Sequence, residues 1–314
     1  MLKLIRYPQN PLLLPDKNNE WESSAVYNAS AVKAGDKFYM VYRAFDSAGR
    51  STIGVAEGNS PVSFSNRRLF IKPENPWEQY GCEDPRVARV DDKFFISYTA
   101  ISTWPPTSDG IKVGMAETSD FQKIDEKHAL TTFNSKALGF FPDKVMGKYA
   151  AILAANTDKP PAKIGIALFE KKEDIWNESY WNDWYTHLDV HSLEIPVKSE
   201  DHIEVGAAPL KVPEGWLLIY SYIENYFSQN KGWRIDALLL DSNDPLKIIG
   251  RTDGPLLYPN EDYEIYGNVY NIVFPSGALI EGDTLYVYYG GADTVICVAT
   301  CKVSELISEI HAKI

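Results

Sequence analysis

One β-hairpin pattern occurs five times in the 314 residues, and this repeat limits the available folds more than any other feature of the chain. Each copy has an apolar stretch, a short polar turn and a strand rich in aromatic and β-branched residues, as antiparallel hairpins do. The five copies are residues 31–44, 87–100, 143–155, 209–222 and 278–291.

A shorter apolar strand follows each hairpin, so the repeating unit is three or four antiparallel strands, spaced at roughly 55–70 residues. One unit cannot bury both of its faces, whereas five units stacked around an axis can. We therefore expect an all-β fold, a single five-bladed β-propeller domain of residues 1–314. The expected blades are 26–75, 81–130, 136–185, 203–252 and 268–302.

The last residues, 303–314, are the only segment in which we recognise a helical period. Val303, Leu306, Ile307 and Ile310 recur at the spacing of one helix face. We expect a short C-terminal helix that caps one of the blades.

Composition and charge exclude several classes of partner. The net charge of −12 disfavours a nucleic acid partner, which needs a basic surface. Prolines interrupt the N-terminal stretch and no apolar run is long enough to span a membrane, so we expect neither a signal peptide nor a membrane partner. The irregularly spaced Cys82, Cys297 and Cys301 favour a reducing, cytoplasmic location. A homo-oligomer remains open.

Polar residues stand at the starts and ends of the expected inner strands. In a propeller these strands converge on the axis, so we expect such residues to meet at one mouth. The residues at strand starts are Asn28, Glu83, Asp84, Arg86, Asp143, Lys144, Glu204 and Asn271, and those at strand ends are Arg43, Tyr98 and Asp293.

The most concentrated of these groups is "GCEDPRV", in which Glu83 and Asp84 precede Pro85 and Arg86. Pro85 favours an extended Asp84, and strand alternation then points Glu83 and Asp84 to opposite sides. They should therefore not share a proton. The competing interpretation is a structural corner in which Arg86 neutralises Asp84; the polar residues from the remaining repeats favour a functional Asp84.

Aromatic side chains are concentrated in residues 174–191, where they could stack on sugar rings or cover a seam between blades. The five histidines show no metal-binding spacing, and no glycine-rich phosphate loop is found. We therefore expect no metal and no organic cofactor.

Five ordered sequence blocks carry a resemblance to a known family. They are "YNASAV…FYMVYRA", "GCEDPRVARVDDKFFISYTA", "FFPDKVMGKY", "GWLLIYS" and "YNIVFPSGAL…LYVYYGGADTVICVAT". With them the chain resembles glycoside hydrolase family 130, the mannoside phosphorylases and β-mannosidases, whose fold is a five-bladed β-propeller.

The resemblance implies manno-oligosaccharide substrates and a role for Asp84 as the general acid. In this family the acid protonates the glycosidic oxygen through a mannose hydroxyl, and the nucleophile attacks the opposite face with inversion. The expected substrate-binding residues are Asn28, Arg43, Arg86, Tyr98, Asp143, Lys144, Tyr220, Glu264, Asn271 and Asp293.

The chain departs from the phosphorylase pattern at three basic positions. Leu153 and Ala154 stand where the family has His-Arg, Glu204 replaces a lysine, and Ser221 falls in the family's Tyr-His-Gly. A misplaced unit charge at about 4 Å costs roughly 4 kcal/mol at an effective dielectric constant of 20, so we expect weak phosphate binding. The sequence therefore predicts an inverting hydrolase of β-mannosidic bonds.

In that hydrolase Glu204 is the expected water-activating base, and Glu261 and Glu264 are second choices. Two further functions stay open. A β-mannoside phosphorylase would use inorganic phosphate as co-substrate and release mannose 1-phosphate, with Lys144, Lys163 or Arg251 as its cations. A non-catalytic carbohydrate-binding propeller would have Asp84 ion-paired and closed off.

Overall fold

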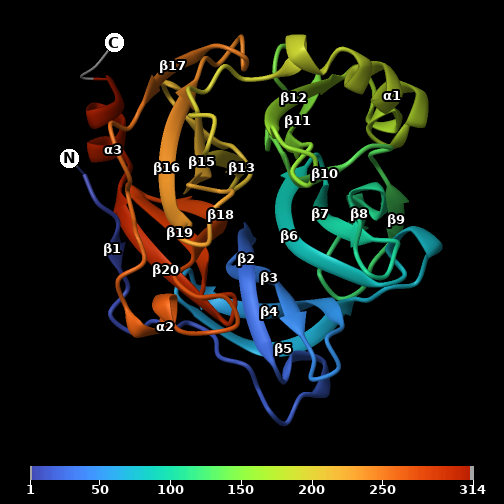
Figure 1. Ribbon diagram of the computed structural model, residues 1–314, viewed down its shortest axis with the longest axis vertical. Helices are drawn as coiled ribbons and strands as arrows, with labels where there is room; N and C mark the ends of the chain where they lie inside the picture. Colours follow the sequence, from blue (N-terminus) through green and yellow to red (C-terminus); the bar gives the residue numbers. More distant parts are fainter. Residues whose placement is uncertain (1, 312–314) are drawn as a thin grey trace.

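The computed structural model describes residues 2–311 and confirms an all-β protein with a short C-terminal helix. Its strands form four hydrogen-bonded sheets that do not close on one another. The antiparallel pairing runs in five successive groups of strands, and the largest sheet contains two of them because β4 and β6 share a single parallel pair, Ser51 with Gly81. Figure 1 shows the five groups around a common centre, with β2, β6, β10, β13 and β18 nearest to it.

The strands follow the hairpin repeat. The first group is β2 (Ala25–Ala34), β3 (Lys37–Phe45), β4 (Ser51–Ser60) and β5 (Ser63–Ile71). The second is β6 (Gly81–Val90), β7 (Lys93–Ile101), β8 (Ile111–Thr118) and β9 (Glu126–Ala129), and the third is β10 (Ser135–Phe140), β11 (Tyr149–Ala155) and β12 (Lys163–Phe169). The fourth is β13 (His202–Val205), β14 (Leu210–Val212), β15 (Gly215–Glu224), β16 (Gly232–Leu240) and β17 (Ile248–Arg251).

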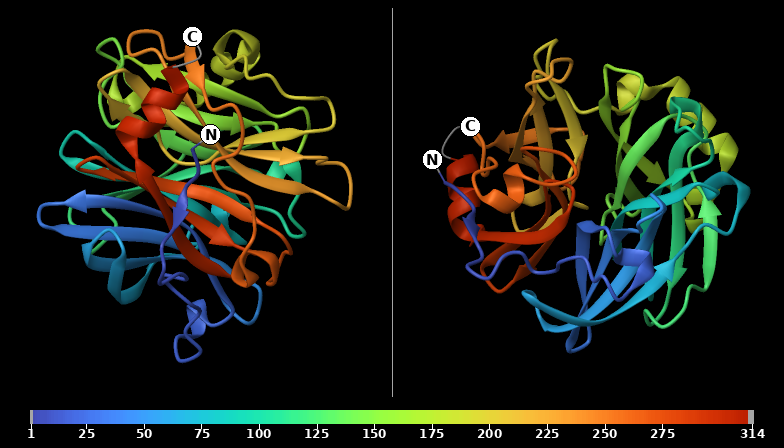
Figure 2. Two further views of the ribbon diagram at one scale, coloured as in Figure 1. Left: turned by 90° about the vertical axis from the view of Figure 1, so that its left-hand side faces the viewer. Right: turned by 60° about the horizontal axis from the view of Figure 1, so that its bottom comes forward.

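The fifth group brings the two ends of the chain together. It contains β18 (Val273–Glu281), β19 (Thr284–Gly291) and β20 (Val295–Lys302), and the N-terminal β1 (Ile5–Arg6) pairs with β20 as its outer strand. Figure 2 shows β1 and the C-terminal helix side by side on this group.

Five clusters of buried apolar side chains lie between successive groups. For each cluster we give two residues, one from each of the groups that it joins. Val41 and Ile96 belong to the cluster between the first and second groups, Phe95 and Leu153 to the next, and Ile152 and Leu218 to the third. Ile219 and Val287 belong to the fourth, and Met40 and Tyr288 to the fifth, which joins the fifth group to the first. Every group is thus packed on two neighbours, and the apolar contacts run full circle.

A helix of nine residues, α1 (Glu178–Thr186), was not expected from the sequence. It begins at Asn177, whose side chain accepts hydrogen bonds from the backbone of Ser179 and Tyr180. Its polar residues mask the helical period, but Trp181 and Trp184 share one buried face. The aromatic segment 174–191 therefore includes tryptophans that cover the seam between the second and third groups, as the second interpretation of this segment proposed.

The remaining helices are short. They are α2 (Asp262–Ile265), α3 (Val303–His311) and the 3₁₀ turns η1 (Glu20–Glu22), η2 (Pro76–Glu78), η3 (Ser108–Gly110), η4 (Lys172–Trp176) and η5 (Leu188–His191). The helix α3 confirms the predicted C-terminal helix over its described residues. Among residues 2–311, no helix has both the length and the apolar character needed to cross a membrane.

Candidate functional site

The innermost strands carry β-bulges near their first residues. The antiparallel register shifts between Tyr27 and Ser30 in β2, between Glu83 and Arg86 in β6, and between Lys136 and Gly139 in β10. A bulge redirects side chains that a regular strand would send to alternate faces. The bulged residues have positive φ, an arrangement that Asn and Asp tolerate better than most side chains: Asn28 (50°), Asp84 (52°) and Ala137 (55°).

The bulge in β6 brings both acids of the "EDPR" motif to one arginine. Arg43 Nη2 lies 2.6 Å from Glu83 Oε1, and Arg43 Nη1 lies 3.3 Å from Asp84 Oδ1. The expectation that Glu83 points away from Asp84 was therefore wrong, because it assumed regular strand alternation. Burial raises the pKa of the Glu83 carboxyl, with the Asp84 charge adding to this and Arg43 opposing it.

Asp84 is held as an anion but is not closed off. Asn28 Nδ2 donates a hydrogen bond of 2.8 Å to Asp84 Oδ1. Burial alone would raise the pKa of the Asp84 carboxyl, but Arg43, the bond from Asn28 and Arg86 together hold it below its ordinary value. The Asp84 side chain is 20% exposed, so a ligand can reach it.

Arg86 connects two strands across the centre and does not pair with the Asp84 carboxylate. Its guanidinium donates to three backbone carbonyl oxygens, those of Asp84 at 3.0 Å, Val205 at 2.9 Å and Gly206 at 2.6 Å. Burial lowers the pKa of Arg86 to about 10, so it stays protonated at neutral pH. Arg86 therefore has a structural role, as the structural-corner interpretation proposed. Its hydrogen-bond partners, however, are backbone carbonyls and not the Asp84 carboxylate.

Lys136 is a cation of this region that was not predicted from the sequence. It stands at the bulge of β10, opposite Ala154 of β11, and its Nζ lies 2.9 Å from Asp158 Oδ1. Burial alone would lower its pKa, but the charges of Glu204, Asp158 and Asp84 raise it. Its side chain remains 26% exposed.

The reason for this omission is a wrong strand assignment in the third repeat. We expected 143–155 to hold the whole hairpin, which placed Asp143 and Lys144 at the start of an inner strand. The inner strand is instead β10, so Asp143 and Lys144 lie in the turn that joins β10 to β11. The segment "SKALGF" that forms β10 has no regular alternation of polar and apolar residues, so its sequence does not mark it as a strand.

Glu204 and Asp293 complete the charged residues of this region. Glu204 Oε1 lies 3.3 Å from His202 Nε2, and in the strand register Glu204 faces Ser221 of β15. Burial raises the pKa of Asp293 to about 6, with Arg43 opposing and the Asp84 charge reinforcing this shift. We call these residues together the central charged cluster: Asn28, Arg43, Glu83, Asp84, Arg86, Lys136, Asp158, Glu204 and Asp293.

Two predicted tyrosines lie in seams between groups and outside this cluster. The Tyr98 hydroxyl donates to Glu78 Oε2 at 2.6 Å, and its ring packs on Trp77 in the seam between the first and second groups. Tyr220 is buried in the seam between the third and fourth groups. Tyr98 and Tyr220 lie within their strands and not at the ends. Side chains there alternate between the two faces of the sheet, so these tyrosines point into the seams and not toward the centre.

The remaining predicted residues are also separate from the central charged cluster. Glu264 is buried against Arg6, 2.7 Å away, and accepts a hydrogen bond from the Tyr289 hydroxyl, so it holds β1 and β19 together. Its partners keep the pKa of Glu264 low in spite of burial. Asn271 is exposed in the loop before β18.

Three other candidates lie at the ends of helices or strands. They are Glu261, a second-choice base, and Lys163 and Arg251, two cations expected for a phosphorylase. Glu261 caps α2, Lys163 pairs with Asp189, and Arg251 ends β17. None of these three side chains belongs to the central charged cluster, so they give no support to the roles expected for them.

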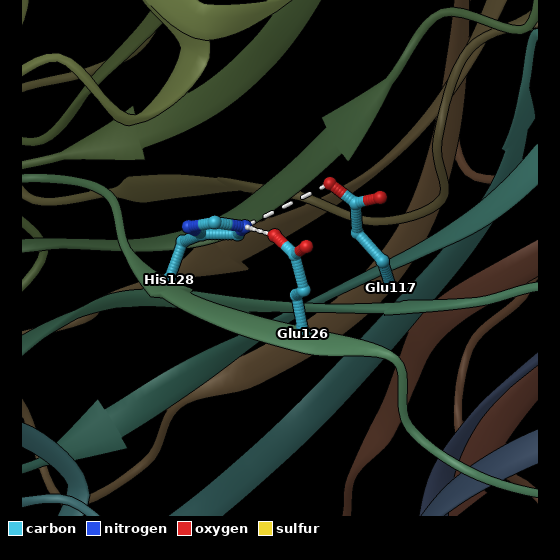
Figure 3. Close-up of side chains that lie close together, drawn as sticks. All are labelled: Glu117, Glu126 and His128. Carbon is cyan, nitrogen blue, oxygen red and sulfur yellow. Dashed lines mark ion pairs between the residues drawn. The ribbon is translucent and has the colours of Figure 1, made fainter.

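Three side chains of types that can ligate a metal ion lie close together on β8 and β9: Glu117, Glu126 and His128 (Figure 3). His128 Nε2 lies 3.3 Å from Glu126 and 3.7 Å from Glu117. Glu117 is also paired with the ammonium groups of Lys93, at 3.4 Å, and Lys172, at 3.2 Å. These lysines already supply positive charge to Glu117, the more buried of the two carboxylates, so we interpret the group as an ion-pair network.

Comparison with known proteins gives matches over nearly the whole chain. The model of the glycoside hydrolase 130 family, described as beta-1,4-mannooligosaccharide phosphorylase, matches residues 6–311. A 1,2-beta-oligomannan phosphorylase of Thermoanaerobacter sp. (strain X514) is 31% identical, with 98% of this chain and 99% of the relative covered. A beta-1,2-mannobiose phosphorylase of the same organism is 32% identical, with 96% and 98% covered.

A solved structure agrees with these matches. Beta-1,2-mannobiose phosphorylase from Listeria innocua, in complex with beta-1,2-mannobiose, superposes with a TM-score of 0.81 over 99% of this chain and 100% of that one. The two sequences are 22% identical, so this likeness supports the fold and not the activity.

Proposed function

The chain belongs to the glycoside hydrolase 130 family, and from this we propose that it is a β-mannoside phosphorylase. It would cleave a β-mannosidic bond with inorganic phosphate and release mannose 1-phosphate. The observation that carries the proposal is the full-length similarity to relatives named as mannoside phosphorylases. Because both of these names specify the β-1,2 linkage, β-1,2-linked mannosides are the first substrates to test.

The hydrolase predicted from the sequence is corrected by the same relatives, which are phosphorylases. That prediction rested on the absence of basic residues at Leu153, Ala154, Glu204 and Ser221. It left out Lys136, which stands directly opposite Ala154 in the strand register. The strand β11 lacks the basic residue that the family has at Ala154, but the neighbouring strand β10 has Lys136 at the paired position.

We further propose that the five strand groups are the blades of one five-bladed β-propeller, which spans the described residues 2–311. The support is the circular order of the five apolar clusters, in which the last cluster joins the fifth group to the first. One such group cannot bury both faces by itself, so packing on two neighbours accounts for its stability.

In this proposal the phosphate binds between Arg43 and Lys136. Both are charged, both are partly exposed, and a phosphate dianion needs charge-assisted donors of this kind. Arg86 contributes charge only, because its guanidinium donates to backbone carbonyls. Glu204 then accepts a hydrogen bond from the single P–OH of monohydrogen phosphate, and this bond offsets part of the repulsion between its carboxylate and the co-substrate.

Asp84 is the proposed acid, and phosphate binding prepares it for that role. In the free protein Arg43 and Asn28 hold the pKa of Asp84 low, which leaves it without the proton that an acid needs. A dianion beside Arg43 and Lys136 offsets these cations and raises the pKa of Asp84. In the reaction the mannose C1–O bond breaks, a phosphate oxygen bonds to C1 with inversion, and the proton of Asp84 passes to the leaving oxygen through a mannose hydroxyl.

Product analysis tests the proposed function directly. Incubation with β-1,2-mannobiose and phosphate should give mannose 1-phosphate and mannose in equal amounts, and dialysis against phosphate-free buffer should stop turnover. Ion chromatography or phosphorus NMR identifies the sugar phosphate. Formation of two mannose molecules per bond cleaved, at a rate independent of phosphate, would reject the phosphorylase.

The pH dependence should change with phosphate concentration. A general acid acts while protonated, so the activity is present below its pKa and is lost as pH rises through it. At subsaturating phosphate the midpoint of this loss should reflect the low pKa of Asp84, and at saturating phosphate it should move to higher pH. Initial rates measured across pH at both concentrations check this, and an unchanged midpoint would contradict the coupling.

A further inference from the structure

We propose that Glu204 and His202 together make the phosphate site selective for oxyanions that carry a hydroxyl, so that the protein uses phosphate and rejects sulfate. This inference rests on the proposed function, because it concerns the same phosphate site. It is carried by the hydrogen bond between His202 and Glu204, by the packing that holds His202, and by the position of Glu204 in the central charged cluster.

His202 and Glu204 lie on one face of β13. They are two residues apart in this strand, and alternate side chains of a strand point to the same side. His202 Nε2 is 3.3 Å from Glu204 Oε1, and the two side chains are 2% and 15% exposed. A carboxylate only accepts hydrogen bonds, so the imidazole hydrogen is on Nε2 and points at Oε1. The second carboxylate oxygen, Oε2, is then available to a ligand.

Tyr226 fixes the ring of His202. The two rings are stacked, with their centroids 4.1 Å apart and their planes 13° from parallel. Tyr226 is itself held in the turn after β15, because its backbone N–H donates to the carbonyl oxygen of Glu200 at 2.8 Å and Lys231 Nζ lies 4.4 Å from its ring centroid. A ring that is packed in this way keeps its orientation, so His202 continues to direct Nε2 at Glu204 and restricts the carboxylate to one position.

Glu204 approaches the phosphate site from the inner strand next to that of Lys136. The strands β10 and β13 are neighbours around the centre (Figure 1), and a Cβ atom on Gly139 of β10 would lie only 2.7 Å from the Cα atom of Ala208, which follows β13. Burial would lower the pKa of Lys136, and among the charges that raise it the charge of Glu204 is the strongest. Glu204 is therefore close enough to interact with an anion that binds Lys136.

This arrangement distinguishes two anions of the same charge and similar size. Monohydrogen phosphate has one hydroxyl, which donates a hydrogen bond to Glu204 and offsets part of the repulsion between the two negative groups. Sulfate is a dianion without a hydroxyl at neutral pH, so it presents only acceptor oxygens to the carboxylate and meets the full repulsion. An acceptor left without its donor corresponds to a loss of roughly 5- to 150-fold in affinity. We therefore expect sulfate to bind poorly, although Arg43 and Lys136 attract both anions.

Inhibition by sulfate tests this inference. Formation of mannose 1-phosphate from β-1,2-mannobiose is measured over a phosphate series, with potassium sulfate or with potassium chloride at the same ionic strength. The Ki for sulfate should exceed the KM for phosphate at least about tenfold, whereas arsenate, which keeps a hydroxyl, should compete with phosphate at a Ki within about threefold of that KM. Glu204→Gln should lower the ratio of the Ki for sulfate to the KM for phosphate at least about fivefold, because the amide has no charge and can donate to sulfate.

Variants of His202 distinguish a positioning role from a merely structural one. His202→Phe keeps a ring that stacks on Tyr226 but cannot donate, so Glu204 is free to turn away and the same ratio should fall. His202→Gln restores a donor at the place of Nε2 and should keep the original ratio. His191→Phe is the matched control, because His191 also stacks on an aromatic ring, that of Trp184 at 5.5 Å, but lies outside the central charged cluster.

The outcomes separate this inference from the proposed function. If no sugar phosphate forms under any of these conditions, the proposed function is wrong and the inference falls with it. If sugar phosphate forms and sulfate inhibits with a Ki close to the KM for phosphate, the inference alone is wrong. The same conclusion holds if either Glu204→Gln or His202→Phe folds and leaves the ratio unchanged. The comparison of sulfate with arsenate uses the unmodified protein, so it decides the question even where a variant does not fold.

Discussion

Replacing Asp84 by Asn is expected to lower the rate of mannose 1-phosphate formation by about 10²–10⁴-fold, the usual contribution of a general acid. The amide keeps the shape and can still accept the hydrogen bond that Asn28 donates, so the fold should persist. It cannot supply the proton. The loss should appear in initial rates with mannobiose, whose leaving group is a poorly acidic sugar hydroxyl, and should shrink with an activated aryl mannoside.

Binding of phosphate should not weaken in the same variant. Asp84 is an anion that competes for Arg43, so its removal should leave the KM for phosphate unchanged or lower it. Asp143→Asn is the matched control: the same chemical change in an exposed turn at the opposite edge of the sheets, where activity should stay within about twofold. Near-normal turnover of mannobiose by Asp84→Asn would remove Asp84 from the mechanism.

The hairpin repeat predicted the strands well because each hairpin carries its own turn residues and β-branched or aromatic strands. The third repeat failed because the turn between β10 and β11 is long and contains the short pair Val145 and Lys148, which resembles a hairpin of its own. The helix α1 was missed for a different reason. Its buried face is only Trp181 and Trp184, and seven of its nine residues face partly or fully outward.

The candidate site was predictable only where a side chain lies at a strand end and faces the centre. Asn28, Arg43 and Asp84 meet as expected, because the inner strands converge and the repeats align them. The relation between Glu83 and Asp84 could not be derived from alternation, since a β-bulge cancels alternation and leaves no clear pattern in the sequence. Tyr98 shows the opposite case, where regular alternation directs a side chain into a seam.

Replacing Lys136 by Met should lower kcat/KM for phosphate roughly 10- to 150-fold, the range that corresponds to losing one hydrogen bond to a charged group. Lys136 interacts with the charges of Asp158, Glu204 and Asp84. Without it only Arg43 remains in the described cluster to contact the phosphate directly, because the Arg86 guanidinium donates to backbone carbonyls. The KM for mannobiose at saturating phosphate should change little. Initial rates over a phosphate series measure both constants.

Removing Lys136 also leaves the partly buried Asp158 without its ion-pair partner, which lowers stability by itself. The double variant Lys136→Met with Asp158→Asn removes both charges and separates the two effects, because it should fold normally and still bind phosphate poorly. Lys144→Met is the control: a lysine that lies over the Tyr149 ring at the opposite edge and should not affect phosphate. If the double variant folds and keeps the original KM for phosphate, then phosphate binds elsewhere, and the positive charge of Lys136 serves only to balance Asp158 and Glu204.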